Sequence, residues 1–492
     1  MKQLKLLTAA PLLAAIALTG CARNPVTGAS DVAIISEKGE IEQGRKAHEQ
    51  IKRAFGVYED QALQDYVNEL GQRLARVSHR PDLEWHFTVT DQDRINAFAL
   101  PGGYIYIERG IMAYINSEAE LASILGHEIG HVTARHSVRQ QSQGLATGIL
   151  ATAAAIFTQN RALADLANIG GTALMRGYGR EMELEADRLG AQYMSKIGYD
   201  PQAVIKMLGV LKNQELFELD RAKAEGRDPQ IYHGVFSTHP SADQRLQQAV
   251  AVAGSPFIKE GENRGLVGHD EYLNRIDGLP FGTSRAQGII RENRFYHADM
   301  NLTMAFPKDW VVLNQPTRIL AHTRAKDALI QFVADKVEEK QTPKEFLEKQ
   351  LRGRSLHSGE SIEWNGMQGY TVVTKGGSPL DGGSGPVRYT ALYRGTTVYV
   401  ISAASRSSQN GLPMHDRIFL STAQTLRELK PSELPLAEPY RLRMLKATNK
   451  TRMADLAKES PLPKYAEAQL RLINDMYPKR EPKAGETVKI VE

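Results

Sequence analysis

The feature that most constrains this chain is a pentapeptide, His127–His131, with the sequence His-Glu-Ile-Gly-His. Residues four positions apart lie on the same face of an α-helix, so both imidazoles can reach one metal ion. The spacing also places Glu128 beside that ion, where a carboxylate can take a proton from metal-bound water. The pentapeptide therefore predicts a helix that carries two metal ligands and a general base. The alternative is a helix whose two histidines belong to a satisfied polar face.

Local signals before the pentapeptide favour a helix. Ser117 is the predicted N-cap, and Glu120 completes a capping box by reaching back toward it. Apolar residues then recur at helical spacing, at Leu121, Ile124, Leu125 and Val132.

A second segment, Gly179–Gly190, is also predicted to be helical. One stripe of it, at positions i, i+3, i+4 and i+7, holds Glu183, Ala186, Asp187 and Gly190. Its small residues would let the segment approach the first helix closely, where Gly126 and Gly130 have the same effect. The stripe therefore predicts two carboxylates that face the paired histidines.

Glu183 is the predicted third ligand, with Glu181 and Glu185 as competing candidates on other faces of the segment. Asp187, one turn on, can accept a hydrogen bond from a ligating histidine and fix its tautomer. Two histidines and one glutamate leave the fourth position of tetrahedral zinc for water. We therefore expect one Zn²⁺ ion per chain. The alternative for any one of the three glutamates is a solvated helix side chain.

A strand-like block between residues 84 and 107 interrupts the helical pattern. Within it, Ala97–Leu100, the turn Pro101–Gly103 and Tyr104–Ile107 predict a hairpin whose edge lies near the metal. An extended peptide could pair with that edge by β-augmentation. The alternative is a strand that is wholly internal to its sheet.

The N-terminal segment Met1–Gly20 has the lysines and the short apolar stretch of a secretory signal. Leu18–Cys21 resembles the bacterial lipobox, and the only cysteine of the chain lies at its lipidation position. Acyl chains would anchor the protein firmly, because each buried methylene contributes about 0.8 kcal/mol. Ala22, where some lipoproteins have Asp, indicates the outer membrane by resemblance to proteobacterial lipoproteins. The alternative is an ordinary secreted protein with a stray cysteine.

Composition excludes several classes. The chain has 61 basic and 57 acidic residues, a balance that gives no reason to expect a nucleic-acid partner. Its single cysteine excludes an intramolecular disulfide framework and any cysteine-based structural zinc site.

The organisation along the chain predicts an α+β protein. After the signal peptide (1–20) and a lipidated tether (21–36), a mainly helical domain with a small β-sheet covers 37–254. A linker is expected at 255–294, and short β-type runs then predict an α+β domain over 295–430.

Residues 438–492 are predicted to form a small tail with two helices and a final strand. The tail resembles a degenerate LysM-type βααβ module, a class that binds peptidoglycan. The alternative is a generic tail that only packs.

The motifs together resemble the HtpX and CAAX-prenyl-endopeptidase family of gluzincin zinc metallopeptidases, in particular its periplasmic lipoprotein members (BepA-like, LoiP-like). Beyond the two metal-binding segments, the resemblance rests on Asn24–Gly28, Asn96–Gly103, Thr238–Pro240 and Arg245. It covers about residues 22–250, and no tetratricopeptide helices follow. The resemblance implies a zincin-type fold in which His127, His131 and Glu183 bind zinc, Glu128 is catalytic and Asp187 supports a ligand.

The same resemblance adds further candidates. Asn96, Ala97, Phe98 and Ala99 are expected to bind substrate, and Arg245 either orients substrate, braces Glu183 or is a surface arginine. His239 precedes Pro240, so its backbone is biased toward extended conformations. The resemblance implies that His239 masks the zinc or acts as an oxyanion donor, and the alternative is a packing role.

We therefore expect a zinc endopeptidase that is lipid-anchored at Cys21 and faces the periplasm, where it acts in envelope protein quality control. Its expected partners are unfolded or misassembled envelope proteins, the outer membrane and peptidoglycan, with no nucleic acid. The first rival is a non-proteolytic chaperone or scaffold for outer-membrane assembly whose zinc is capped by His239. A peptidoglycan-binding protein without enzymatic activity is the second rival, and it would leave the metal residues without a purpose.

Overall fold

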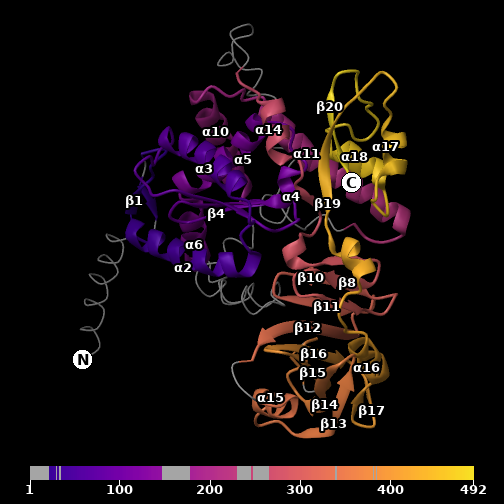
Figure 1. Cartoon of the computed structure of the whole chain (residues 1–492). Coiled ribbons are helices and arrows are strands. Elements are labelled where there is room, and N and C mark those ends of the chain that lie inside the picture. The colour runs from indigo at the N-terminus through magenta and orange to yellow at the C-terminus, as the bar shows by residue number, and fades with distance from the viewer. Residues whose placement is uncertain are drawn as a thin grey trace, which may run out of the picture. The chain divides into compact units, whose positions relative to one another are not determined.

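The computed structural model describes residues 21–28, 30–32, 35–146, 178–229, 245, 247, 265–337, 341–380, 382–383 and 385–492. The chain divides into two compact units (Figure 1). Unit 1 comprises residues 1–281 and 440–492, and unit 2 comprises residues 282–439. Unit 2 is therefore inserted in the sequence between two parts of unit 1.

Unit 1 contains a three-stranded sheet in the order β3-β5-β4. Its strands are β3 (His86–Thr90), β4 (Ala97–Leu100) and β5 (Tyr104–Glu108). β3 runs parallel to β5, and β4 runs antiparallel to β5. The turn between β4 and β5 uses Gly102 and Gly103 at φ values of 83° and 95°, which glycine adopts at little cost. The predicted hairpin is confirmed, and β5 is the central strand of this sheet, with β3 and β4 on either side of it.

Helices cover both faces of the sheet. Phe98 and Leu100 of β4 pack with α2 (Glu37–Phe55), which holds Ala47 and Ile51 in the same cluster. Ala97 and Ala99 belong to the main core of unit 1, which includes α3 (Gln61–Arg76) and α5 (Glu118–Thr133). Alternate residues of β4 therefore face opposite layers, as the two-residue period of a strand requires.

α5 is the centre of unit 1, because every one of its residues is buried. Ser117 caps its N-terminus by accepting from the Glu120 backbone N–H, as predicted. The Glu120 carboxylate accepts from the Ser117 hydroxyl and from the Asn116 backbone N–H, one residue further back than a capping box requires. The remaining helices are α4 (Arg109–Met112), α6 (His136–Ala146), α10 (Arg180–Lys196), α11 (Ala203–Glu225) and α14 (His269–Ile276).

α10 packs closely on α5 through the small residues that the sequence singled out. A Cβ atom on Gly126 would lie 3.0 Å from the Gly190 Cα, and one on Gly130 would lie 3.0 Å from the Ala186 Cα. A Cβ atom on Gly190 would come within 2.8 Å of the His127 backbone nitrogen. The predicted close approach is confirmed, and it brings the acidic stripe of α10 against the histidines of α5.

The C-terminal residues complete unit 1. A second sheet has the order β20-β19-β6, formed by β6 (Pro280–Phe281), β19 (Tyr440–Lys446) and β20 (Thr487–Val491). Between β19 and β20 lie α17 (Met453–Glu459) and α18 (Ala466–Ile473). The predicted β-α-α-β order is present. The tail is not separate, however, because Leu442, Met453 and Ile473 belong to the same hydrophobic core as α5.

Unit 2 is dominated by a seven-stranded antiparallel sheet in the order β10-β11-β12-β16-β15-β14-β13. Its strands are β10 (Val311–Gln315), β11 (Arg318–His322), β12 (Ala328–Lys336), β13 (Leu356–Trp364), β14 (Met367–Lys375), β15 (Pro386–Arg394) and β16 (Thr397–Ser405). The helices are α15 (Pro343–Gln350) and α16 (Asp416–Gln424). The predicted β-rich texture of this region is confirmed.

A smaller sheet opens unit 2, formed by β7 (Ile289–Arg291), β8 (Arg294–His297) and β9 (Leu302–Ala305). Residues 255–294 were expected to be a linker, yet the described part of this segment, 265–294, contains α14, β6 and β7. The segment is rich in glycine and charged residues, which is typical of a linker. It is ordered because α14 packs into the core of unit 1 and β7 packs into the core of unit 2.

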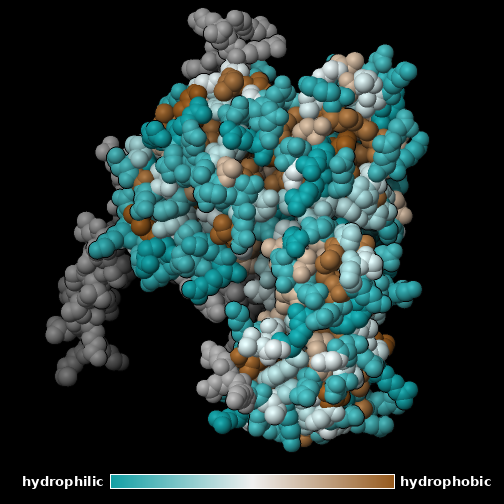
Figure 2. Space-filling model, viewed as in Figure 1, coloured by the Kyte–Doolittle hydropathy of each residue, from teal (hydrophilic) through white to brown (hydrophobic). Residues whose placement is uncertain are grey.

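None of the helices in the described residues is long and apolar enough to cross a membrane. On the face drawn in Figure 2, hydrophilic residues predominate and hydrophobic residues form small separate patches. The short strands β1 (Cys21–Arg23) and β2 (Ser30–Val32) pair with each other near the start of the described chain.

Candidate metal centre

Three side chains converge between α5 and α10. Donor atoms of His127, His131 and Glu183 lie within 4.8 Å of one another, and all three residues are buried. The two Nε2 atoms are 2.9 Å apart, and each lies 3.5 Å from a carboxylate oxygen of Glu183. Ligands on a tetrahedral ion with bonds of 2.0–2.1 Å would be separated by about 3.3 Å. Two nitrogens and one oxygen in this arrangement fit a zinc ion.

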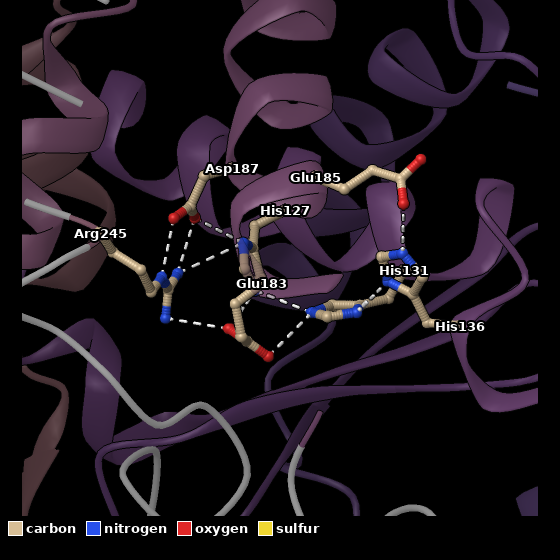
Figure 3. A network of polar contacts seen from close by, with 7 residues as sticks. All are labelled: His127, His131, His136, Glu183, Glu185, Asp187 and Arg245. Carbon is tan, nitrogen blue, oxygen red and sulfur yellow. Dashed lines mark hydrogen bonds and ion pairs between the residues drawn. The ribbon is translucent and has the colours of Figure 1, made fainter. Parts of the chain in front are cut away.

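Asp187 and Arg245 hold the His127 side of the centre (Figure 3). His127 Nδ1 lies 2.7 Å from Asp187 Oδ1, and an ionised carboxylate can only accept. Nδ1 therefore carries the proton, which leaves the Nε2 lone pair for a metal. Arg245 Nη2 is 3.4 Å from the same Nδ1, but the shorter contact to the carboxylate decides the tautomer.

Arg245 binds both buried carboxylates of α10. It donates through Nε and Nη2 to Asp187 at 2.7 and 2.6 Å, and its Nη1 lies 3.1 Å from Glu183 Oε2. Burial opposes ionisation of Asp187, yet the guanidinium and His127 hold the pKa of Asp187 well below its usual range. Arg245 therefore lies in the bracing position, one of the roles predicted for it.

The His131 side has different chemistry. His131 Nδ1 lies 2.7 Å from His136 Nδ1, and His136 Nε2 lies 3.1 Å from Glu185 Oε2. Arg139 also donates to Glu185, at 2.9 Å. Burial lowers the pKa of His136 although Glu185 opposes the shift. The hydrogen bond from His136 lowers the pKa of Glu185 to about 2, so this carboxylate is ionised at neutral pH.

A tight turn brings His136 back toward the ligands. α5 ends at Thr133, Arg135 adopts φ 53°, and α6 begins at His136. The Arg135 guanidinium donates to the buried Glu40 carboxylate at 2.8 Å, which anchors the turn. The one sequence signal for this arrangement is a further histidine, His136, five positions after His131. Only the turn at Arg135 brings that histidine into contact with the ligand.

Glu128 lies next to the converging ligands. It is buried and lines a small cavity with His127, Ala97 and Arg245. A second small cavity is lined by Ala99, His131 and Tyr178, among other residues. Tyr178 stacks on the His131 ring with centroids 4.0 Å apart, a contact that the sequence analysis did not identify.

β4 lines both cavities, with Ala97 at the one beside Glu128 and Ala99 at the one beside Tyr178. The Glu108 N–H donates to the Asn96 carbonyl, which makes these two residues a hydrogen-bonded pair. Because such pairs alternate along an antiparallel ladder, the backbone groups of Ala97 and Ala99 point away from β5. The Asn96 side chain is itself engaged, because its amide donates to the buried Glu108 carboxylate at 3.2 Å.

Other predicted site residues are less informative. The Phe98 side chain lies on the α2 face of the sheet, where it stacks on Tyr106. Glu181, a competing ligand candidate, is exposed, and Glu185 contacts His136 instead of the metal ligands. His239 and the side chain of Cys21 lie outside the described residues.

Comparison with known proteins agrees with this geometry. Residues 61–253 match peptidase family M48. The β-barrel assembly-enhancing protease of Escherichia coli K12 is 32% identical over 234 residues, which are 46% of this chain and 46% of that protein. The mitochondrial metalloendopeptidase OMA1 of Arabidopsis thaliana is 30% identical over 224 residues, 44% of this chain and 42% of that protein.

Residues 61–253 are therefore similar to peptidase family M48, and the predicted resemblance to BepA-like metallopeptidases is confirmed over that region. The matched region spans about half the length of the curated relatives. Among solved structures, cyanobacterial PsbP from Synechocystis covers 29% of this chain and 96% of its own, with 10% identity and a TM-score of 0.22. That likeness is too low to say anything about function.

Proposed function

We propose that this chain is a zinc-dependent endopeptidase of the bacterial periplasm. The observation that carries the proposal is the convergence of His127, His131 and Glu183 with Glu128 beside them. The M48 match supports a metallopeptidase role for the same residues.

In the proposed chemistry each of these side chains has one role. A zinc ion bound by the three ligands would polarise a scissile carbonyl and lower the pKa of its bound water toward about 7. Glu128 would take the proton of that water and pass it to the leaving amine. Asp187 and Arg245 would keep His127 and Glu183 oriented while this occurs.

Substrate would bind as an extended peptide along the edge of β4 that points away from β5. The outward backbone groups of Ala97 and Ala99 can pair with such a peptide, and the strand passes the cavities beside His127 and His131. Main-chain pairing is independent of side-chain identity, so unfolded proteins are the proposed substrate class. Arg245 would act by bracing rather than by contacting substrate.

The proposed setting is the envelope. A lipid on Cys21 would hold the protein on the outer membrane facing the periplasm, and misassembled envelope proteins would be its substrates. The name of the Escherichia coli relative, a β-barrel assembly-enhancing protease, supports this setting. The β-α-α-β order of residues 440–491 supports peptidoglycan as a further partner. Retention of the full chain on purified murein tests that partner.

The decisive test is Glu128→Gln, measured for zinc content and for cleavage of unfolded casein. We expect one zinc per chain in both proteins and a loss of turnover of about 10²–10⁴-fold in the variant. A wild type that binds zinc but cleaves nothing, together with a variant that still complements a deletion strain, would establish the scaffold function instead.

His239 is proposed to mask the zinc or to donate to the oxyanion. His239→Ala is expected to change turnover, upward for a mask and downward for a donor. Unchanged turnover and zinc affinity would show that His239 only packs.

A further inference from the structure

The two metal-binding imidazoles differ in what their outer nitrogen contacts. His127 Nδ1 faces the Asp187 carboxylate, whereas His131 Nδ1 faces another imidazole, that of His136 (Figure 3). His136 is completely buried, with its ring edge-on to that of His131 at 4.9 Å between centroids. Neither the proposed mechanism nor the family resemblance gives His136 a task.

The positions of the protons follow from the metal outward. If His131 binds metal through Nε2, that nitrogen needs its lone pair, so Nδ1 carries the proton. The His136 Nδ1 atom, 2.7 Å away, must then accept, and the proton of His136 lies on Nε2. Nε2 is 3.1 Å from Glu185 Oε2, which can accept it.

We propose that His136, oriented by Glu185, is a positioning residue that fixes the metal-binding tautomer of His131. The inference rests on the proposed zinc site and extends it to two residues without direct contact to the ion. Arg139 donates at 2.9 Å to the same Glu185 oxygen that His136 contacts, so the series of contacts runs from Arg139 through Glu185 and His136 to His131.

This arrangement predicts a specific pattern of tolerance. His136→Leu removes the acceptor and is expected to weaken zinc binding by about 10–100-fold. His136→Asn keeps an oxygen acceptor near the position of Nδ1 and is expected to retain most of the affinity. Glu185→Leu removes the carboxylate that orients His136. The Glu185 side chain is 17% exposed, so this variant tests the same series of contacts without leaving a cavity in the core.

The experiment measures zinc affinity by competition with a chromophoric chelator for the full-length wild type and each variant. Because His136 and Glu185 act in series, the double variant His136→Leu/Glu185→Leu should lose little more than either single variant. His48→Leu is the matched control, since His48 is a half-buried histidine of the same unit that contacts Tyr106 instead of the metal centre. Circular dichroism verifies that each variant is folded.

A second measurement is independent of activity and of zinc loading. Long-range ¹H–¹⁵N NMR of histidine-labelled protein distinguishes a protonated from an unprotonated ring nitrogen. We expect Nδ1 of His131 to be protonated in the metal-free wild type and in His136→Asn, and to exchange between tautomers in His136→Leu. Wild-type zinc affinity in His136→Leu and Glu185→Leu, or a wild-type His131 with its proton on Nε2, would overturn the inference. A wild type that binds no zinc refutes the proposed function, whereas the metal-free NMR spectrum still decides the role of His136.

Discussion

Two buried arginine–aspartate ion pairs, Arg245–Asp187 in unit 1 and Arg388–Asp416 in unit 2, serve different ends. In unit 1, Arg245 donates twice to Asp187, which in turn contacts His127. In unit 2, Arg388 of β15 donates twice to Asp416 of α16, at 2.8 and 2.7 Å. The two salt bridges have the same bidentate geometry and similar burial.

The difference lies in what else each pair contacts. Beyond Asp416, Arg388 Nη1 lies 3.3 Å from the Ser358 carbonyl and from the Thr371 hydroxyl, so this pair ties a helix to a sheet. Arg245 and Asp187 instead contact two of the three candidate metal ligands. A buried ion pair therefore indicates a functional site only when its remaining contacts lead to reactive groups.

The largest expected effect comes from removing a ligand. Glu183→Gln replaces the buried carboxylate with a neutral amide, so we expect zinc affinity to fall by at least about 10³-fold and cleavage to be lost, because the third donor is a much weaker zinc ligand. Chelator competition measures the affinity. Unit 2 should unfold at an unchanged urea concentration, and retained zinc binding would show that Glu183 is not a ligand.

Arg388→Met tests the pair of unit 2. It leaves Asp416 buried without its cation, and breaking a buried pair in this way costs about 3–5 kcal/mol in the free energy of unfolding. Urea unfolding followed by the fluorescence of Trp310 and Trp364, in a Trp85→Phe background, reports on unit 2 alone. Zinc affinity should be unchanged. The double variant Arg388→Met/Asp416→Leu should recover most of the stability, and a change in zinc affinity would contradict the comparison.

Arg245→Met makes the same substitution in unit 1. The loss of orientation of Asp187 and Glu183 is expected to weaken zinc binding by about 10–100-fold. Unlike the unit 2 variant, it should be stabilised by added zinc, because the ion supplies positive charge to the same carboxylates. Thermal unfolding with and without zinc measures this rescue, and equal responses of the two variants would remove the distinction.

Lys489 is a buried basic side chain whose hydrogen-bond partners are backbone carbonyls instead of a carboxylate. Its Nζ donates to Ala113 and Ile115 at 2.8 and 2.7 Å, and burial lowers its pKa to about 7. Between pH 7 and the usual lysine pKa of about 10.4, the unfolded chain binds more protons than the folded one. Stability of unit 1 should therefore rise with pH in this window, by up to about 1.4 kcal/mol per pH unit.

The measurement is urea unfolding at pH 7, 8 and 9 followed by the fluorescence of Trp85 in a Trp310→Phe/Trp364→Phe background. Lys489→Met keeps a long apolar side chain but removes the titration, so its stability should vary less with pH. A wild-type slope equal to that of Lys489→Met would show that Lys489 does not titrate in this range.

Local periodicity made several features predictable. The helical spacing of His127 and His131, the small stripe of Gly179–Gly190 and the hairpin over residues 97–107 follow from periods of 3.6 and two residues, which a single segment displays. The β-rich texture of unit 2 was visible for the same reason. The sequence alone therefore determined which helix faces could meet and which side chains could bind a metal.

Long-range packing decided the rest. The sequence left open whether Arg245 would brace Glu183 or lie on the surface, and its contact with Asp187, 58 residues away, resolved this in the fold. His136 gained a role only because Arg135 turns the chain back toward His131. Lys489 joins the last strand to Ala113, 376 residues earlier, and places the tail in the core of unit 1. Burial determines these partners, because a buried charged group needs a counter-charge or a carbonyl from whichever part of the chain packs against it. The spacing of residues in the sequence does not indicate which part that is.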